Sequence, residues 1–167
     1  MNTFLLILSV IVAIALFTSW IASRPRGHQL FPLANIGEGT HAGPLTKFSD
    51  AAIATRYLLG KFGSDVNHVA VAGANDKPLG IIADEASAAE EPVAVQLLGV
   101  AESTRKCVTS EAIALTDELY TAANGKVQNL PAAAGTYYKV GRPLQAAAGA
   151  DEVIEFEPCF PVAVVVP

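Results

Sequence analysis

Every charged side chain of this sequence lies after residue 23, and this division limits what each part can fold into. Met1–Ser23 contains no Asp, Glu, Lys, Arg or His, whereas Arg24–Pro167 carries all eleven Lys and Arg, all sixteen Asp and Glu and all three His. An uncharged apolar segment favours a membrane or an apolar partner. The remaining residues, about 140, suit one domain with one hydrophobic core.

The apolar part of the first segment, Phe4–Ala22, is long enough to span a membrane as a helix. Its nineteen residues rise ~1.5 Å each, which approaches the ~30 Å hydrocarbon core. Trp20 near its end, with Arg24 and Arg26 just after it, fits the interfacial flank of an anchor. We therefore expect a hydrophobic helix in residues 1–23.

Two other interpretations of this segment stay open. A signal peptide normally has Lys or Arg before its apolar run, and none is present here. The segment could also be an extension upstream of a true start near Leu30 or Leu33. In each case, membrane contact is expected only through residues 4–22.

Residues 24–50 are predicted to form an extended arm, and residues 51–167 a compact domain. Arg24–Pro44 is rich in Gly and Pro and shows no hydrophobic periodicity. Gly37 and Gly39 allow close backbone approach, and His41 follows them. We expect these three residues to contact a neighbouring chain, since an extended arm can add a strand to another protein. Their spacing is not that of a dinucleotide-binding loop.

Charge and cysteine content exclude several functions. The net charge is −5 and the Lys and Arg residues are scattered, so we expect no nucleic-acid partner, which would require a basic face. Cys107 and Cys159 are far apart in the sequence and lack metal-ligand spacing. They are either two free thiols or one disulfide. We expect no metal and no cofactor.

Short apolar or alternating runs recur at intervals of about ten residues after residue 50, which indicates a β-barrel or a β-sandwich. Asn124-Gly125 is a strong signal for a hairpin turn. Only Ser49–Thr55 and Ala86–Glu90 suggest helical turns. The predicted strands are Arg56–Phe62, His68–Ala72, Leu79–Ala83, Pro92–Val100, Arg105–Thr109, Ile113–Tyr120, Tyr137–Gly141, Val153–Phe156 and Val162–Val166.

No group of residues in the sequence predicts catalysis. There is no G-x-S-x-G motif, and Ser64, Asp65 and His68 share a turn too local for a catalytic triad. Glu155 and Glu157 lie two residues apart, so they share one face of a strand and favour a salt-bridge surface for a partner.

Tyr137 and Tyr138 are adjacent in a predicted strand, so one of the two side chains must point away from the core. Such an exposed tyrosine could anchor an interface. We include both tyrosines among the candidate interface residues.

Several motifs in order resemble the capsid decoration, or capsid cement, proteins of tailed phages. The similarity runs from about Ala34 to Pro158 and rests on the series Lys77–Asp84, Pro92–Val100, Asp117–Val127, Tyr138–Leu144 and Val153–Pro158. The resemblance implies a mainly β protein with a small β-barrel or β-tulip-like domain.

The resemblance also implies homotrimers on the outside of an icosahedral phage head. There they would bind the major capsid protein and tie neighbouring capsomers together, without catalysis or a cofactor. The expected location is the virion surface. A membrane-anchored β-domain that acts as an envelope-associated structural or adaptor module is the alternative, because it accounts for Met1–Ser23. An enzyme is a third alternative, for which the sequence shows no convergent polar groups.

Overall fold

The computed structural model describes residues 43–99 and 103–167, which belong to one compact unit. The expected hydrophobic helix in residues 1–23 and most of the expected arm lie outside the described residues. Among the residues that are described, no helix combines the length and the apolar character needed to cross a membrane.

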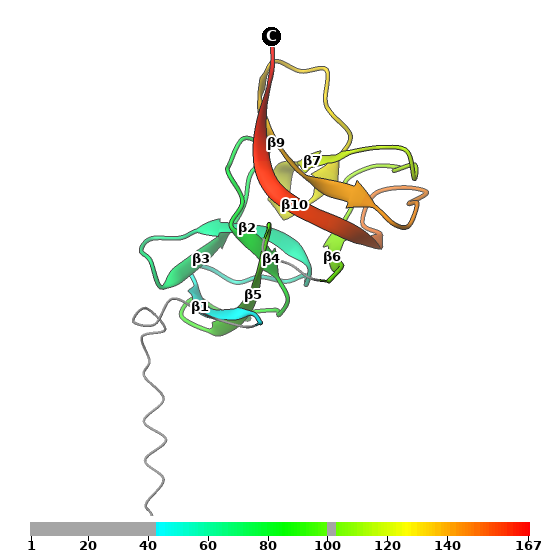
Figure 1. Cartoon of the computed structure of the whole chain (residues 1–167). Coiled ribbons are helices and arrows are strands. Elements are labelled where there is room, and N and C mark those ends of the chain that lie inside the picture. Colours follow the sequence, from blue (N-terminus) through cyan, green and yellow to red (C-terminus); the bar gives the residue numbers. More distant parts are fainter. Residues whose placement is uncertain (1–42, 100–102) are drawn as a thin grey trace, which may run out of the picture. The chain divides into compact units, whose positions relative to one another are not determined.

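The first five strands close into a barrel in the order β1-β3-β2-β4-β5 (Figure 1). Strand β1 closes it, because it runs antiparallel to β5 and also pairs in parallel with β3. Closure leaves no unpaired strand edge in the barrel. The strands are β1 (Leu45–Ser49), β2 (Leu58–Phe62), β3 (His68–Val71), β4 (Gly80–Ile82) and β5 (Pro92–Leu97).

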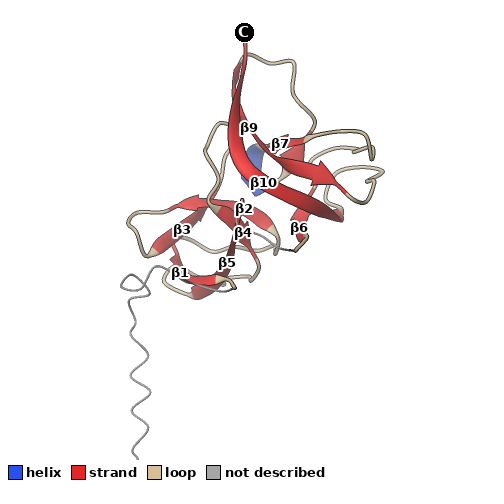
Figure 2. Ribbon diagram, viewed as in Figure 1, coloured by secondary structure: helices blue, strands red, loops and turns tan. Residues whose placement is uncertain are grey.

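The second half of the chain forms a five-stranded antiparallel sheet in the order β6-β10-β9-β7-β8. Its elements are β6 (Arg105–Val108), β7 (Leu119–Thr121), the short 3-10 helix η1 (Ala123–Gly125), β8 (Val127–Gln128), β9 (Gly135–Pro143) and β10 (Val153–Val166). Figure 2 shows that strands dominate the described chain. The prediction of a mainly β protein with a small barrel is therefore confirmed.

The barrel begins earlier than the sequence indicates. Leu45–Ser49 lies within the expected arm, residues 24–50, but it forms β1 and pairs with two neighbouring strands. The two expected helical turns are also wrong. Ile53 and Ala86, one from each segment, exchange backbone hydrogen bonds of 2.7 and 3.0 Å, so the segments pair with each other instead of coiling.

Two expectations about strand length also differ from the structure. In Ile113–Tyr120 only the last two residues enter β7, because Asp117 accepts a hydrogen bond from the Ala114 amide and holds a turn. The expected separate strands Val153–Phe156 and Val162–Val166 are one strand, β10, with a register shift between Pro158 and Val162. A bulge of this kind lets a strand continue past residues that do not fit the ladder.

One hydrophobic cluster lies inside the barrel. It comprises Ile53, Leu58, Val69, Ile82, Ala86, Val93, Val95 and Val108. Because side chains alternate along a strand, the neighbours of Leu58 and Ile82 point out of the barrel. These neighbours, Leu59 and Ile81, are fully buried as well.

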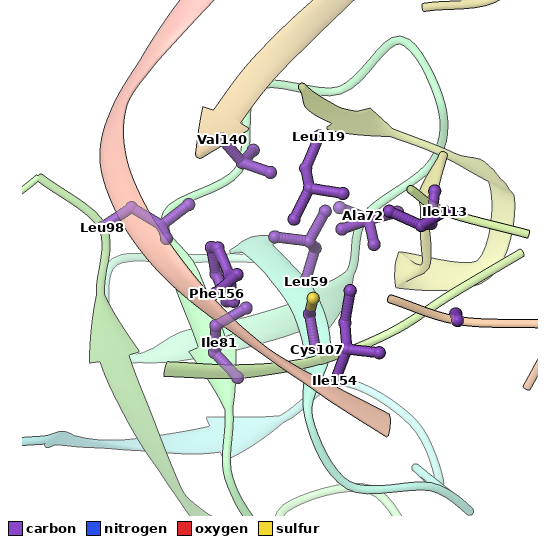
Figure 3. Packing of buried hydrophobic residues seen from close by; sticks show 12 residues of the cluster. Leu59, Ala72, Ile81, Leu98, Cys107, Ile113, Leu119, Val140, Ile154 and Phe156 are labelled. Carbon is purple, nitrogen blue, oxygen red and sulfur yellow. The ribbon is translucent and has the colours of Figure 1, made fainter. Parts of the chain in front are cut away.

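The outer face of the barrel packs against the second sheet. Leu59 and Ile81 belong to the same cluster as Cys107, Ile154 and Phe156 of the second sheet (Figure 3). This shared core explains why residues 58–60 of β2 and all of β4 are apolar, since both faces of the strands are covered there. The barrel and the sheet are thus joined by buried apolar surface, the main favourable term in folding.

Candidate functional site

The outer face of β10 carries the two acidic residues predicted to form an interaction surface. Glu155 and Glu157 lie on the face opposite the buried Ile154 and Phe156. Glu157 pairs with Arg142, its register partner on β9. Glu155 accepts a hydrogen bond from the hydroxyl of Thr104 and lies opposite Lys106 on β6.

Lys139 on the neighbouring β9 adds another ion pair, with Glu118. The hydrogen bond from Lys139, together with a second from Tyr120, holds the pKa of Glu118 below its usual value. Exposed ion pairs of this kind add little to stability, because solvent screens the two charges. Their side chains present opposite charges side by side, which gives a partner orientation and specificity more than affinity.

The two candidate tyrosines lie on β9 beside the second half of β10. Tyr137 is opposite Val164 and Tyr138 is opposite Ala163. Tyr137 is buried and Tyr138 is half-buried. The amide of Tyr138 donates a hydrogen bond of 3.1 Å to Thr121 Oγ1.

Large apolar side chains are exposed around these tyrosines. On β10 the exposed fraction is 53% for Val162 and 72% for Val165. Val162–Val166 was predicted as an apolar strand, but its exposure was not predicted. Val162–Val166 contains five apolar residues in succession. A half-buried strand alternates apolar and polar residues, so this lack of alternation was a signal that the outer face of the strand is apolar too.

A second apolar patch lies on the barrel and was also missed. Phe62 and Val66 are 59% and 62% exposed. Lys47 joins Phe62 and Val66, since its ammonium group lies 5.7 Å from the Phe62 ring centre and donates to the Val66 carbonyl. We call Phe62 and Val66 the barrel patch.

The described histidine, His68, is bound by two carboxylates. Its Nδ1 lies 2.7 Å from Asp65 Oδ1 and its Nε2 lies 3.1 Å from Glu90 Oε1. The hydrogen bond with Asp65, followed by that with Glu90, raises the pKa of His68 above its ordinary value. Ser64 bonds to Asp50 instead, with its hydroxyl 2.8 Å from Oδ1. His68 therefore links two barrel loops and has no hydroxyl to activate in this group.

The cysteines are both free thiols, Cys107 buried and Cys159 half-buried. Burial raises the pKa of the Cys107 thiol to about 12, so it is not ionised at neutral pH. Among residues 43–99 and 103–167, no group of three or more potential ligands could hold a metal ion. Gly37, Gly39 and His41, the candidate residues of the arm, lie outside the described residues.

Comparisons with known proteins give one family match and a structural likeness in fold. The family model described as phage cement protein matches residues 58–158. No curated protein matches the sequence. Among solved structures, the head fiber gp8.5 N base of bacteriophage phi29 is similar with a TM-score of 0.53 and 15% sequence identity, over 71% of this chain and 94% of that one. At this identity the likeness extends to the fold.

Proposed function

The chain belongs to the phage cement protein family, and on this premise we propose that it binds the outside of an icosahedral phage head as a homotrimer and strengthens the contacts between capsomers. The family is one of structural virion proteins, not of enzymes. The family match over residues 58–158 carries the proposal, because it runs from the start of β2 into β10 and so includes barrel strands β2 to β5 and the second sheet up to the first part of β10.

The proposed mechanism relies on many weak contacts. Packaged DNA presses on a capsid of identical subunits, and a cement protein that bridges capsomers adds a contact free energy at each junction. A trimer that engages three subunits of the major capsid protein gains from multivalency, which can raise avidity about 10²–10⁴-fold above that of one contact. Threefold symmetry of the trimer would match the local symmetry of the shell.

Two described surfaces suit contacts in such an assembly. The charged face around Glu155 and Glu157 offers both signs of charge to the capsid protein. Tyr137 and Tyr138 lie beside exposed valines, and aromatic residues of this kind are enriched at the centres of interfaces. We propose that these four residues take part in capsid or subunit contacts.

The arm is the third proposed contact. Its Gly- and Pro-rich sequence, with Gly37, Gly39 and His41, suits an extended segment that adds a strand to a neighbouring chain. This proposal predicts that the arm contributes to capsid affinity and not to barrel stability.

The decisive experiment is reconstitution on heads that lack this protein. Purified full-length chain is added to such heads, and bound copies per head and the temperature of DNA release are measured. We expect saturable binding at a fixed number of sites and release at a higher temperature. Heads that bind no protein at saturating concentration would refute the proposed function.

The arm is tested on the same heads. Replacing Arg24–Pro44 with a Gly/Ser linker of equal length should weaken binding while the melting temperature of the protein stays the same. Unchanged occupancy at every concentration would refute the role of the arm and leave the main proposal intact.

A further inference from the structure

The second sheet narrows to a ribbon of two strands at one end. Residues 135–139 of β9 pair there with residues 162–166 of β10. Strand β6 pairs with β10 only as far as Phe156, and β7 pairs with β9 only as far as Lys139. Figure 1 shows β9 and the red end of β10 running together to the C-terminus. Among the described strands, none pairs with the β10 edge of this ribbon. On the β9 side, β7 reaches only Lys139, through its register partner Tyr120, and the Tyr138 amide, through Thr121 Oγ1, so the β9 edge is open at residues 135–137.

The other open edges of the described sheet are protected against association, and this one is not. Strand β6 carries Arg105 and Lys106, and β8 has only two residues. Charged side chains and short strands are the usual protection of an edge. The ten residues from Pro158 to Pro167, by contrast, contain no charged side chain.

One face of the ribbon is also free of charge. Ala163 lies opposite Tyr138, and Val165 lies opposite Thr136, and residues opposite each other share a face. Among the described large hydrophobic residues, Val165 is the most exposed, at 72%. Like charges directly opposite each other destabilise a strand pair, so an uncharged face lets a second copy of a chain with net charge −5 approach without such pairs.

The two open edges point to the kind of partner. A partner that binds on one side covers one edge and leaves the other exposed. A ring of identical copies covers both, because the β10 edge of each ribbon can meet the β9 edge of the next until the ring closes. A closed ring of strands has no remaining edge.

We propose that the ribbon, residues 135–139 and 162–166, is the element through which copies of this chain bind one another, with the β10 edge of one copy against the β9 edge of the next. This inference rests on the proposed function, which requires a trimer. It adds which surface of each copy forms the contacts of that trimer. The barrel patch and the charged face stay free in this arrangement, so they are available to the capsid.

The test compares substitutions at two exposed valines in the full-length protein, Val165 at 72% and Val66 at 62% exposure. Val165→Lys places a charge on the ribbon, whereas Val66→Lys places the same charge on the barrel patch. Mass in solution is measured by light scattering, and melting temperature and head binding are measured in parallel. We expect wild type and Val66→Lys to remain oligomeric and Val165→Lys to lose about threefold in mass, with the fold intact.

A second pair of variants tests proximity without adding charge. In a Cys159→Ser background, Val165→Cys should give cross-linked chains with a short bismaleimide, and Val66→Cys should not. If Val165→Lys melts at a much lower temperature than wild type, this cross-linking measurement decides whether the ribbon is the subunit contact. Cross-linking of both variants or of neither would overturn the assignment.

The outcomes separate this inference from the proposed function. If Val165→Lys stays oligomeric, the ribbon is not the subunit contact, and a loss of head binding by that variant would identify the capsid as its occupant. If wild type is monomeric at all concentrations, the inference fails together with the trimer, while head binding of wild type still tests the cement function. If wild type is oligomeric but binds no heads, the ribbon assignment can stand while the proposed function fails.

Discussion

Phe156 is the residue whose truncation should cost the most stability. It is fully buried and packs in the cluster that joins the barrel to the second sheet. Phe156→Ala removes most of a large side chain from this core, so it should lower the free energy of unfolding by about 3–5 kcal/mol. The measurement is urea denaturation of the full-length protein.

Phe62→Ala is the matched control for this substitution. Phe62 is 59% exposed, so the same truncation should change the free energy of unfolding by no more than about 0.5 kcal/mol. Equal losses for the two variants would mean that Phe156 does not occupy a packed core.

His68 should make the stability of the barrel depend on pH. The hydrogen bonds with Asp65 and Glu90 raise its pKa above the ordinary 6.5, so protonated His68 stabilises the folded state. Because the folded pKa is above the unfolded one, this contribution is complete below about pH 6.5 and is lost as the pH rises through the folded pKa. The pKa of Asp65 is lowered in the folded state, so the contribution of Asp65 to stability is lost only below about pH 4. This is outside the pH range in which His68 titrates.

The measurement compares the melting temperatures of wild type and His68→Gln from about pH 5 to about pH 9. Wild type should exceed the variant by the most at the acid end, and the difference should shrink towards the alkaline end. The comparison with the variant removes the effect of the other histidines. A difference that stays constant across the range would show that protonated His68 does not stabilise the fold.

At the scale of elements, the sequence predicts best those features that depend on local turn residues. The Asn124-Gly125 turn could be predicted because both residues tolerate positive φ, and they have φ of 59° and 69°. Strand β1 could not, because its pairing with β3 and β5 is long-range and leaves only Ser49 buried. The union of two runs into β10 depends on a bulge around Pro161, which the sequence alone presents as a break.

In the candidate site, too, local features could be predicted from the sequence and long-range contacts could not. The shared face of Glu155 and Glu157 follows from strand alternation, a local property that the structure reproduces. The ion pair of Glu157 with Arg142 joins residues 15 positions apart, and the contact of His68 with Glu90 joins residues 22 positions apart. Such contacts depend on register and loop closure, which no local pattern encodes.

The hairpin turn should be sensitive at Gly125 because its tip docks on the barrel. The Gly125 amide donates to the Ala72 carbonyl at 2.7 Å, and a Cβ at this position would lie 2.8 Å from the Leu59 carbonyl oxygen. Gly125→Ala therefore adds a left-handed backbone cost of about 1–2 kcal/mol to an overpacking cost of about 1–3 kcal/mol. We expect a loss of about 2–5 kcal/mol in chemical denaturation.

Asn124→Gly is the control in the same turn. Asn124 is exposed and already has positive φ, so replacing it with glycine should lower stability by less than about 1 kcal/mol. If Gly125→Ala cost no more than this, the tip of the hairpin would not be docked on the barrel.

At the scale of the whole molecule, the barrel and the second sheet should unfold together, since they share one core. Leu59 of the barrel and Cys107 of the sheet lie in the same buried cluster. In a Cys159→Ser background Cys107 is the single thiol, so its reaction with a thiol reagent reports the opening of the sheet.

Leu59→Ala should lower stability by about 2–5 kcal/mol. Where reclosing outpaces labelling, the rate follows the population of the open state, so Cys107 should react at least about tenfold faster.

The control is Val66→Ala, which lies on the barrel but outside the shared core and should leave the labelling rate unchanged. If Leu59→Ala lowered the melting temperature while Cys107 kept its wild-type protection, the barrel would open independently of the sheet. A cement protein that unfolds as one unit transmits a load from its capsid contacts to its subunit contacts without a weak joint. Independent opening would mean that the contact between β2 and β6 is the weakest part of the fold.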